Sequence, residues 1–137
     1  MPERPSATVL SAAVALTMSG VAAQAADPAI CAVEQVIACA PFDPCERSLP
    51  GAANLPALMR LDPAARVVVS RFDDGTERRS EVASLTETDE AVILQGADEG
   101  HPWLMRILKE SGRFSLATAQ AEATFMAFGV CSAELLK

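Results

Sequence analysis

The chain is poor in the side chains that most often carry out chemistry in enzymes. Its 137 residues include one histidine, one tryptophan and no tyrosine, and they contain no G-x-S-x-G, no C-x-x-C and no phosphate-binding glycine loop. A serine hydrolase needs a histidine beside its nucleophile, and zinc ligands usually come as close pairs of cysteine or histidine. We therefore expect no catalytic residues, no metal site and no cofactor.

Positive charge is also scarce. The chain has 11 Lys and Arg against 18 Asp and Glu, a formal net charge of −7, and its basic residues form no run. Nucleic acids and anionic membrane surfaces both attract clustered Lys and Arg. We therefore expect no nucleic-acid partner and no membrane association of the mature chain. The acidic balance is typical of a soluble protein, and it also suits a basic protein partner.

The start of the chain has the pattern of a secretory signal peptide. An apolar run from Val9 to Met18 follows Arg4, and Ala23-Gln24-Ala25 is an A-x-A cleavage site. The apolar run is too short to span a bilayer as a helix. Cleavage removes residues 1–25 and leaves a single domain over residues 26–137. We expect a periplasmic or secreted protein.

Four cysteines are an even set, which predicts two disulfides in an exported chain. If Cys31 and Cys39 end one extended strand, they lie roughly 26 Å apart at about 3.3 Å per residue, and a disulfide spans only about 7 Å between Cα atoms. Cys39 and Cys45 instead flank the turn-like segment Ala40–Pro44. We therefore expect the pairs Cys39–Cys45 and Cys31–Cys131, the second of which joins the first strand to the last.

The last third of the chain predicts a hairpin followed by another strand. Apolar and polar residues alternate over Trp103–Leu108, a turn follows at Glu110–Arg113, and the alternation resumes over Phe114–Thr118. The run Thr124–Cys131 is apolar on both faces, which predicts a strand covered on both sides. A helix over Ala117–Met126 is the alternative, because Ala, Gln and Glu favour helices.

Further strands are predicted upstream. Arg66–Phe72 is the clearest, and the turn Asp73-Asp74-Gly75 leads into a more polar strand, Thr76–Leu85. Ala91–Gln95 is a short buried strand. We also expect a first strand over residues 31–39. One of its faces, interrupted by Gln35, should carry Cys31, Val33, Ile37 and Cys39.

The segment between the first strand and Arg66 is more ambiguous. Residues 40–55 contain three prolines and a glycine, and we interpret them as a loop. Leu55–Leu61 fits either a helix that opens at Asn54 or a strand. We favour the strand, because LMRL at 58–61 repeats the pattern LMRI at 104–107.

Eight candidate strands joined by short turns predict an all-β protein. Sequential antiparallel strands form a meander, which at this length closes into a small barrel or folds into a sandwich. We expect bulky inward side chains to fill its middle and to disfavour a ligand cavity: Val67, Val69, Trp103, Met105, Ile107, Phe114, Leu116 and Phe125.

The only histidine lies in an acidic segment, Asp98-Glu99-Gly100-His101-Pro102. Two carboxylates beside a histidine suit a metal site or a general base, but a segment rich in Gly, Pro and acids is also typical of an exposed turn. We interpret Asp98, Glu99 and His101 as a candidate interaction loop. The acid pairs Asp73-Asp74 and Asp89-Glu90 likewise lie at predicted turns.

Several short motifs give the chain a resemblance. With its signal peptide, its early cysteines, the W-x-x-x-I and S-G-R-F motifs of the hairpin and the closing F-G-V-C, it resembles small exported β proteins of alphaproteobacteria, which have no assigned activity. In architecture it is also similar to the periplasmic inhibitors of c-type lysozyme, which are small disulfide-tied barrels. The binding loop of those inhibitors, rich in Ser, Gly and Lys, has no counterpart here.

These observations favour a non-catalytic periplasmic binding or interaction module with a protein or small-molecule partner. Two alternatives belong to other classes. One is an inhibitor of a basic hydrolase such as lysozyme, which would use the acidic loop at Asp98 and Glu99. The other is a lipocalin-like carrier that encloses a small apolar ligand.

Overall fold

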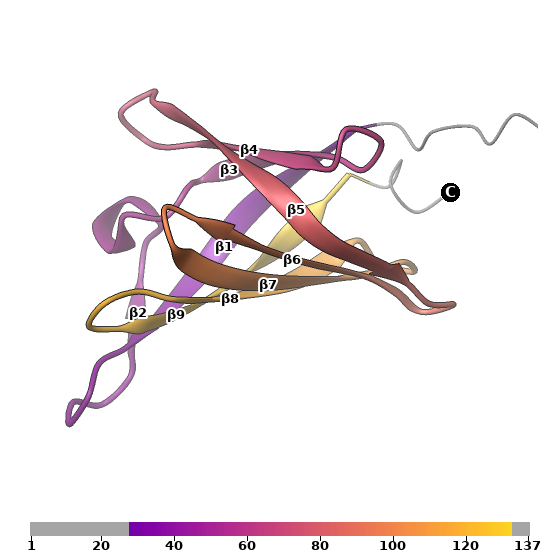
Figure 1. Ribbon diagram of the computed structural model, residues 1–137. Coiled ribbons are helices and arrows are strands. Elements are labelled where there is room, and N and C mark those ends of the chain that lie inside the picture. The colour runs from indigo at the N-terminus through magenta and orange to yellow at the C-terminus, as the bar shows by residue number, and fades with distance from the viewer. Residues whose placement is uncertain (1–27, 133–137) are drawn as a thin grey trace, which may run out of the picture.

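The computed structural model of the protein describes residues 28–132, and the expected signal peptide lies outside them. The described part of the chain contains no helix long and apolar enough to cross a bilayer. Its elements are one 3₁₀ turn, η1 (Gly51–Ala53), and nine strands (Figure 1): β1 (Ala29–Cys39), β2 (Glu46–Ser48), β3 (Leu58–Asp62), β4 (Val67–Arg71), β5 (Glu77–Glu87), β6 (Ala91–Asp98), β7 (His101–Leu108), β8 (Arg113–Ala119) and β9 (Thr124–Cys131).

The strands form one antiparallel sheet that closes on itself. From β3 to β9 each strand pairs with the next in sequence, and β1 pairs with both β3 and β9. Of the nine strands, only β2 stands outside this ring, paired to the second half of β1. The predicted all-β meander is confirmed, and its form is a closed barrel with one extra strand. Closure leaves few backbone groups at open sheet edges.

Three local predictions require correction. The segment expected to be a loop contains β2 and η1, and the third strand begins at Leu58 rather than Leu55. The alternative helix over Ala117–Met126 is wrong, because this segment is the end of β8, a turn and the start of β9. The repeated LMRL and LMRI motifs do form equivalent strands: Met59 and Met105 are both buried, whereas the leucines before them are partly exposed.

Two β-bulges change which residues face the barrel interior. In β1 the register shifts between Val33 and Gln35, so Val36 and not Ile37 becomes the next inward residue and is fully buried. The prediction that Ile37 and Cys39 share the face of Cys31 is therefore wrong. A second bulge lies between Val82 and Ser84 in β5. A bulge inserts one residue and so reverses the alternation beyond it.

A glycine of β9 lies close to the backbone of β1. A Cβ atom on Gly129 would lie 1.9 Å from the Ala32 carbonyl oxygen and 2.7 Å from the Phe114 ring. Real Cβ atoms do not approach other atoms so closely, so the bulged part of the seam requires glycine at this position.

The main core fills one end of the barrel. The expected inward residues Met105, Ile107 and Phe114 belong to it, and Trp103 and Leu116 pack against it. The expectation that Val69 faces inward is wrong, because it pairs with Arg60 and is only partly buried, while Val68 enters the core. Val67 is buried, at 2% exposure, but it pairs with Asp62 and lies outside this cluster. The buried members of the core are Ala29, Cys31, Met59, Leu61, Val68, Val82, Val92, Leu94, Met105, Ile107, Phe114 and Cys131.

The outer face of β9 is not covered as expected. Met126 and Val130 keep 40% and 39% of their surface exposed, whereas Ala127 and Cys131 on the inner face are buried. Phe125 is partly buried and packs in a second, smaller cluster around Val36. The apolar composition of both faces therefore does not mean burial on both faces.

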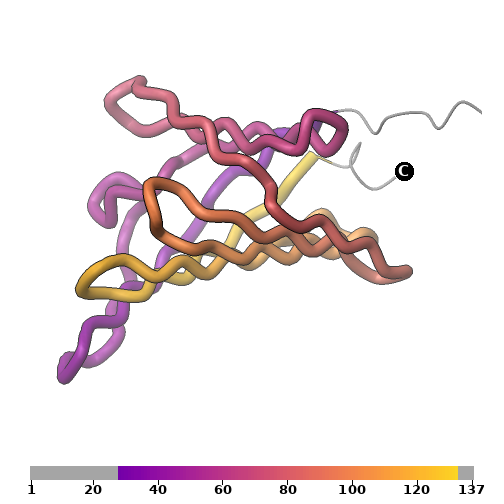
Figure 2. Tube along the Cα trace, viewed as in Figure 1, coloured from indigo at the N-terminus to yellow at the C-terminus, as the bar shows by residue number. Residues whose placement is uncertain are grey.

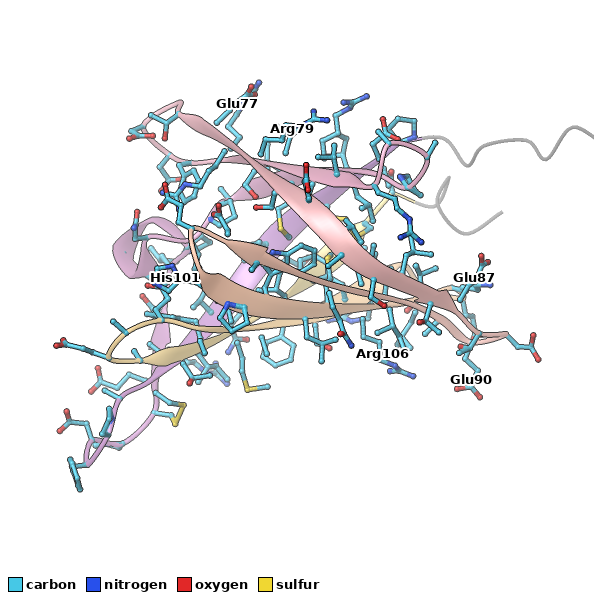
Figure 3. The ribbon with its side chains drawn as sticks, viewed as in Figure 1. Glu77, Arg79, Glu87, Glu90, His101 and Arg106 are labelled. Atoms are coloured by element: carbon cyan, nitrogen blue, oxygen red, sulfur yellow. A yellow bond between two sulfur atoms is a disulfide. The ribbon has the colours of Figure 1, made fainter. Side chains whose placement is uncertain are left out.

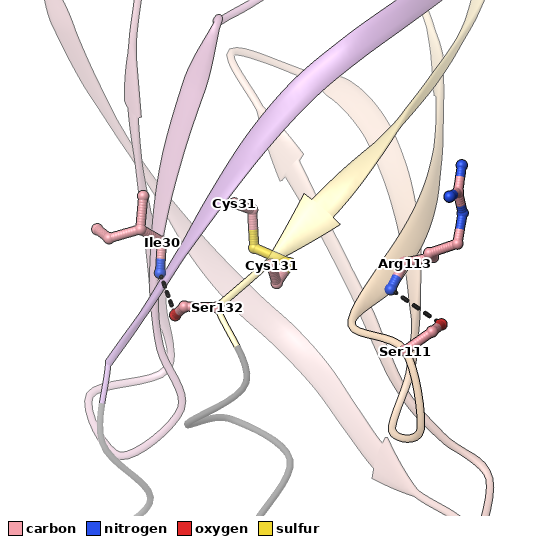
Figure 4. The surroundings of a disulfide bond; sticks show 6 residues. All are labelled: Ile30, Cys31, Ser111, Arg113, Cys131 and Ser132. Atoms are coloured by element: carbon pink, nitrogen blue, oxygen red, sulfur yellow. Dashed lines mark hydrogen bonds between the residues drawn. A yellow bond between two sulfur atoms is a disulfide. The ribbon is translucent and has the colours of Figure 1, made fainter.

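Both predicted disulfides are present: Cys31–Cys131 and Cys39–Cys45. Cys31 and Cys131 are register partners across the β1–β9 seam, and the chain beside them is tied further by the Ile30 amide, which donates a hydrogen bond to Ser132 Oγ at 3.1 Å (Figure 4). The long-range disulfide thus fixes the seam at which the barrel closes.

Candidate functional site

The other end of the barrel contains a cavity of about 90 Å³. Its lining comes from strands on all sides of the barrel and from the connection between β2 and β3. The apolar part of the lining is Val33, Leu55, Pro56, Met59, Val68, Phe72, Trp103, Met105, Leu116 and Ala127. The polar part is Asn54, Ser70, Arg78, Ser80, Asp98, His101, Thr118 and Gln120.

The cavity lies where inward positions of β4, β5 and β8 carry small hydroxyl side chains. On β4 the inward residue after Val68 is Ser70, and on β5 the inward residue before Val82 is Ser80. On β8 the inward series ends with Thr118. An eight-stranded barrel is just wide enough for its side chains to fill, so replacing large residues by serine and threonine leaves space.

The connection between β2 and β3 covers part of the cavity. Leu55 is 6% exposed and packs with Val36 and Ala127 in the second cluster. Its amide donates a 2.9 Å hydrogen bond to the Pro50 carbonyl, which holds it against the turn η1. Leu55 therefore works as an apolar cap on the barrel and not as the first residue of a strand.

Two residues that face this cavity carry hydroxyl groups. Ser80 is 7% exposed and Thr118 is 8% exposed, and both line the cavity. Neither hydroxyl takes part in the side-chain hydrogen bonds formed within residues 28–132. No buried side-chain nitrogen or oxygen of these residues lacks a hydrogen-bond partner, so the two hydroxyls are accessible from the cavity. Each hydroxyl can donate one hydrogen bond and accept two, to water or to a ligand.

The rim of the cavity carries one positive and two negative side chains. Arg78 Nη1 lies 3.2 Å from Asp98 Oδ2 and 3.7 Å from Glu99 Oε2, and its guanidinium lies 4.8 Å from the centre of the Phe72 ring. The Asp98 side chain is 26% exposed, so this pair is partly shielded from water. With both carboxylates beside it, Arg78 does not leave the rim positively charged, and an anion is not favoured there.

The candidate interaction loop is much shorter than the sequence indicates. β6 continues to Asp98 and β7 begins at His101, and these two residues are register partners. Only Glu99 and Gly100 form the turn, with φ values of 48° and 83°. Positive φ at both positions is typical of a tight two-residue hairpin turn. Asp98 and His101 thus line the cavity, and Figure 3 shows His101 at this end of the barrel.

The cavity hydroxyls were not identified from sequence. The pattern V-V-V-S over residues 67–70 was read with the wrong face inward, which assigned Ser70 to the outside. Ser80 lies in a strand whose polar composition indicated only one wet face. The available signal was that Ser70 and Ser80 lie next to Arg71 and Arg79 and therefore on the opposite face of their strands. This signal indicates a cavity only once the barrel is known to close.

The described residues form no metal-binding cluster and contain no free thiol. No three His, Cys, Asp or Glu side chains between residues 28 and 132 come together as a metal site. All four cysteines form disulfides. The cavity lining offers apolar surface and hydrogen-bonding groups.

No protein-family model matches the chain, and comparisons with curated proteins and with solved structures find no significant match. The function has to be inferred from the chemistry of the cavity and the surface.

Proposed function

We propose that the protein is a non-catalytic, exported binding module, and that its barrel cavity holds one end of a small, uncharged and largely apolar ligand. The observation that carries the proposal is the pair of hydroxyls on Ser80 and Thr118, which face a cavity with a largely apolar lining. A ligand that displaced water from these hydroxyls without bonding them would leave them unpaired, at a cost of about 1–3 kcal/mol. The cavity therefore favours a largely apolar ligand that carries a polar atom able to hydrogen-bond them.

The size of the cavity limits how much of a ligand it encloses. Sites that bury a whole drug-sized ligand have volumes of roughly 300–1,000 Å³, and an engineered cavity of about 150 Å³ holds benzene. The cavity here has about 90 Å³. A lipocalin-like carrier that encloses its whole ligand is therefore less favoured than a module that takes in only one end.

The charges at the rim favour an uncharged ligand. Arg78 is already paired with Asp98 and Glu99, so a ligand carboxylate would have to compete with two protein carboxylates. The same pairing weakens the alternative of a hydrolase inhibitor. The acids expected to contact a basic active site are partly neutralised within the protein, and one of them faces the cavity.

Export is part of the proposal and rests on two features. The pattern of residues 1–25 is that of a cleaved signal peptide. Two disulfides are typical of proteins that fold in oxidising compartments. We therefore place the mature protein in the periplasm or outside the cell.

The proposal can be tested with three probes that share a six-carbon chain and differ in the end group and its charge. Trp103 is the sole tryptophan and lines the cavity, so its fluorescence reports occupancy directly. We expect 1-hexanol to give a saturable change, and hexanoate and hexylammonium to bind at least about tenfold more weakly because a charged end is desolvated at the cavity.

A matched pair of variants tests the role of the cavity hydroxyl. Thr118→Val removes the hydroxyl and keeps the shape, and we expect it to weaken 1-hexanol binding by about 2- to 13-fold, the value of one hydrogen bond. Thr86→Val, at an exposed position of β5, should leave the affinity unchanged. No saturable change with any probe, or equal affinities in the two variants, would contradict the proposal.

A further inference from the structure

A second feature lies outside the barrel. The loop between β1 and β2 extends beyond the barrel end, and Figure 2 shows its tip projecting at the lower left, away from the other strands. Phe42 lies in this loop with a relative exposure of 107%, the highest among the exposed large apolar residues. An apolar ring in this position gains nothing from burial within the protein.

The backbone conformation at Phe42 also disfavours this residue. The Asp43 amide donates a 3.4 Å hydrogen bond to the Ala40 carbonyl, which closes a turn with Pro41 and Phe42 at its centre. Phe42 has φ of 69°, in the left-handed region. Proline followed by positive φ is typical of a type II turn, in which glycine or asparagine normally occupies the second central position. Neither packing nor backbone preference explains a phenylalanine here.

The loop is held in this conformation before any partner binds. The Cys39–Cys45 disulfide closes its base (Figure 3), and Pro41 and Pro44 restrict the backbone within it. The strand that leads into the loop is paired on both sides, with β2 and with β9. Binding through a loop that is already ordered loses little conformational entropy.

We propose that residues 40–45 form a rigid knob that inserts Phe42 into an apolar socket on a different protein. Aromatic anchors that enter such pockets are the usual hot spots of protein interfaces. Asp43 follows Phe42 in the chain and Glu46 follows Cys45, and both acids are exposed and form none of the ion pairs of the described residues. With the exposed Arg47 beside them, this border keeps a net charge of −1. The socket is therefore rimmed by Lys or Arg, which complements this acidic border.

Two other occupants fit the observations less well. An anionic bilayer would repel Asp43 and Glu46, and the chain has a net charge of −7. The cavity of a second copy has a rim with two carboxylates beside Arg78, which would also repel the acidic border of the knob. A separate protein with a basic-rimmed socket is left as the favoured partner.

Site-specific photocrosslinking of the full chain tests this inference. A benzoylphenylalanine at position 42, introduced in the cells that make the protein, should give a discrete adduct with another protein. Benzoylphenylalanine at position 49 is the matched control, because Leu49 is also an apolar residue on the adjoining segment and is 72% exposed. We expect no adduct from position 49.

Competition distinguishes insertion of the ring from general adhesion. Excess wild-type protein should abolish the adduct, whereas Phe42→Ser should compete at least about tenfold less well, as expected for a hot-spot residue. Phe42 is fully exposed, so Phe42→Ser should keep the circular dichroism spectrum and melting temperature of the wild type. Equal competition by the two proteins would overturn the inference, as would adducts from both positions or from neither. An adduct formed by the purified protein alone, or Phe42-dependent binding to phosphatidylglycerol vesicles, would also overturn it.

Discussion

Removal of each disulfide in turn should have unequal effects on stability. The Cys31–Cys131 bond closes a loop with a sequence separation of 100, and the Cys39–Cys45 bond one with a separation of 6. If each bond acts by restricting the unfolded chain, the first contributes about 4.7 kcal/mol and the second about 2 kcal/mol. The difference should be larger still, because Cys31 and Cys131 are buried in the core and their replacement by alanine also removes packing.

The measurement is urea unfolding of the wild type, of Cys31→Ala/Cys131→Ala and of Cys39→Ala/Cys45→Ala. Circular dichroism follows the sheet and Trp103 fluorescence follows the cavity end, so agreement between the two probes tests two-state unfolding. We expect the first double variant to lose at least about twice as much stability as the second. Equal losses, or a larger loss from the short loop, would refute the view that the long-range bond holds the barrel seam.

Two further changes test local features of the fold. Gly129→Ala should lower the melting temperature sharply or prevent folding, because its Cβ would meet the Ala32 carbonyl oxygen at 1.9 Å; an unchanged melting temperature would show that the seam is not so close. Thr76 donates hydrogen bonds to Asp74 Oδ1 from its hydroxyl at 2.7 Å and from its amide at 2.9 Å, and these hold the pKa of Asp74 below its ordinary value of 3.8. A lowered pKa stabilises the fold above the unfolded-state value, and this stabilisation is lost as the pH falls through the folded-state value. Thr76→Val should therefore be less stable than the wild type at neutral pH, and pH-dependent unfolding curves should show the difference shrinking as the pH falls below about 3.8; a difference that grows in acid would contradict this assignment.

Local patterns were sufficient to predict eight of the nine strands and the two disulfides, but not β2 or η1. Alternation and turn residues located the hairpins, and the reach of an extended strand excluded a bond between Cys31 and Cys39. The hairpin predictions held because they depend on residues close together in the chain, and the long-range bond Cys31–Cys131 followed by elimination. The boundaries near Leu55 were wrong because its burial depends on contact with β1 and β9, which no local pattern records.

Inward and outward faces were harder to assign. The bulges in β1 and β5 involve no glycine or proline in the inserted part of the strand, so nothing in the sequence marked the change of face at Val36. In β4 three consecutive valines look the same on either face, and only pairing with β3 shows that Val68 lies inside. The cavity depends on closure of the barrel, which brings Ser80 and Thr118 to the same end.

The most direct test of the binding proposal is to locate 1-hexanol by NMR, through nuclear Overhauser effects to methionine methyl groups. Met59 and Met105 line the cavity, whereas Met126 is 40% exposed on the outer face of the barrel. We predict saturable effects between hexanol protons and the methyl groups of Met59 and Met105, weakened in Thr118→Val. Effects confined to Met126, or none at concentrations that change Trp103 fluorescence, would contradict binding in the cavity.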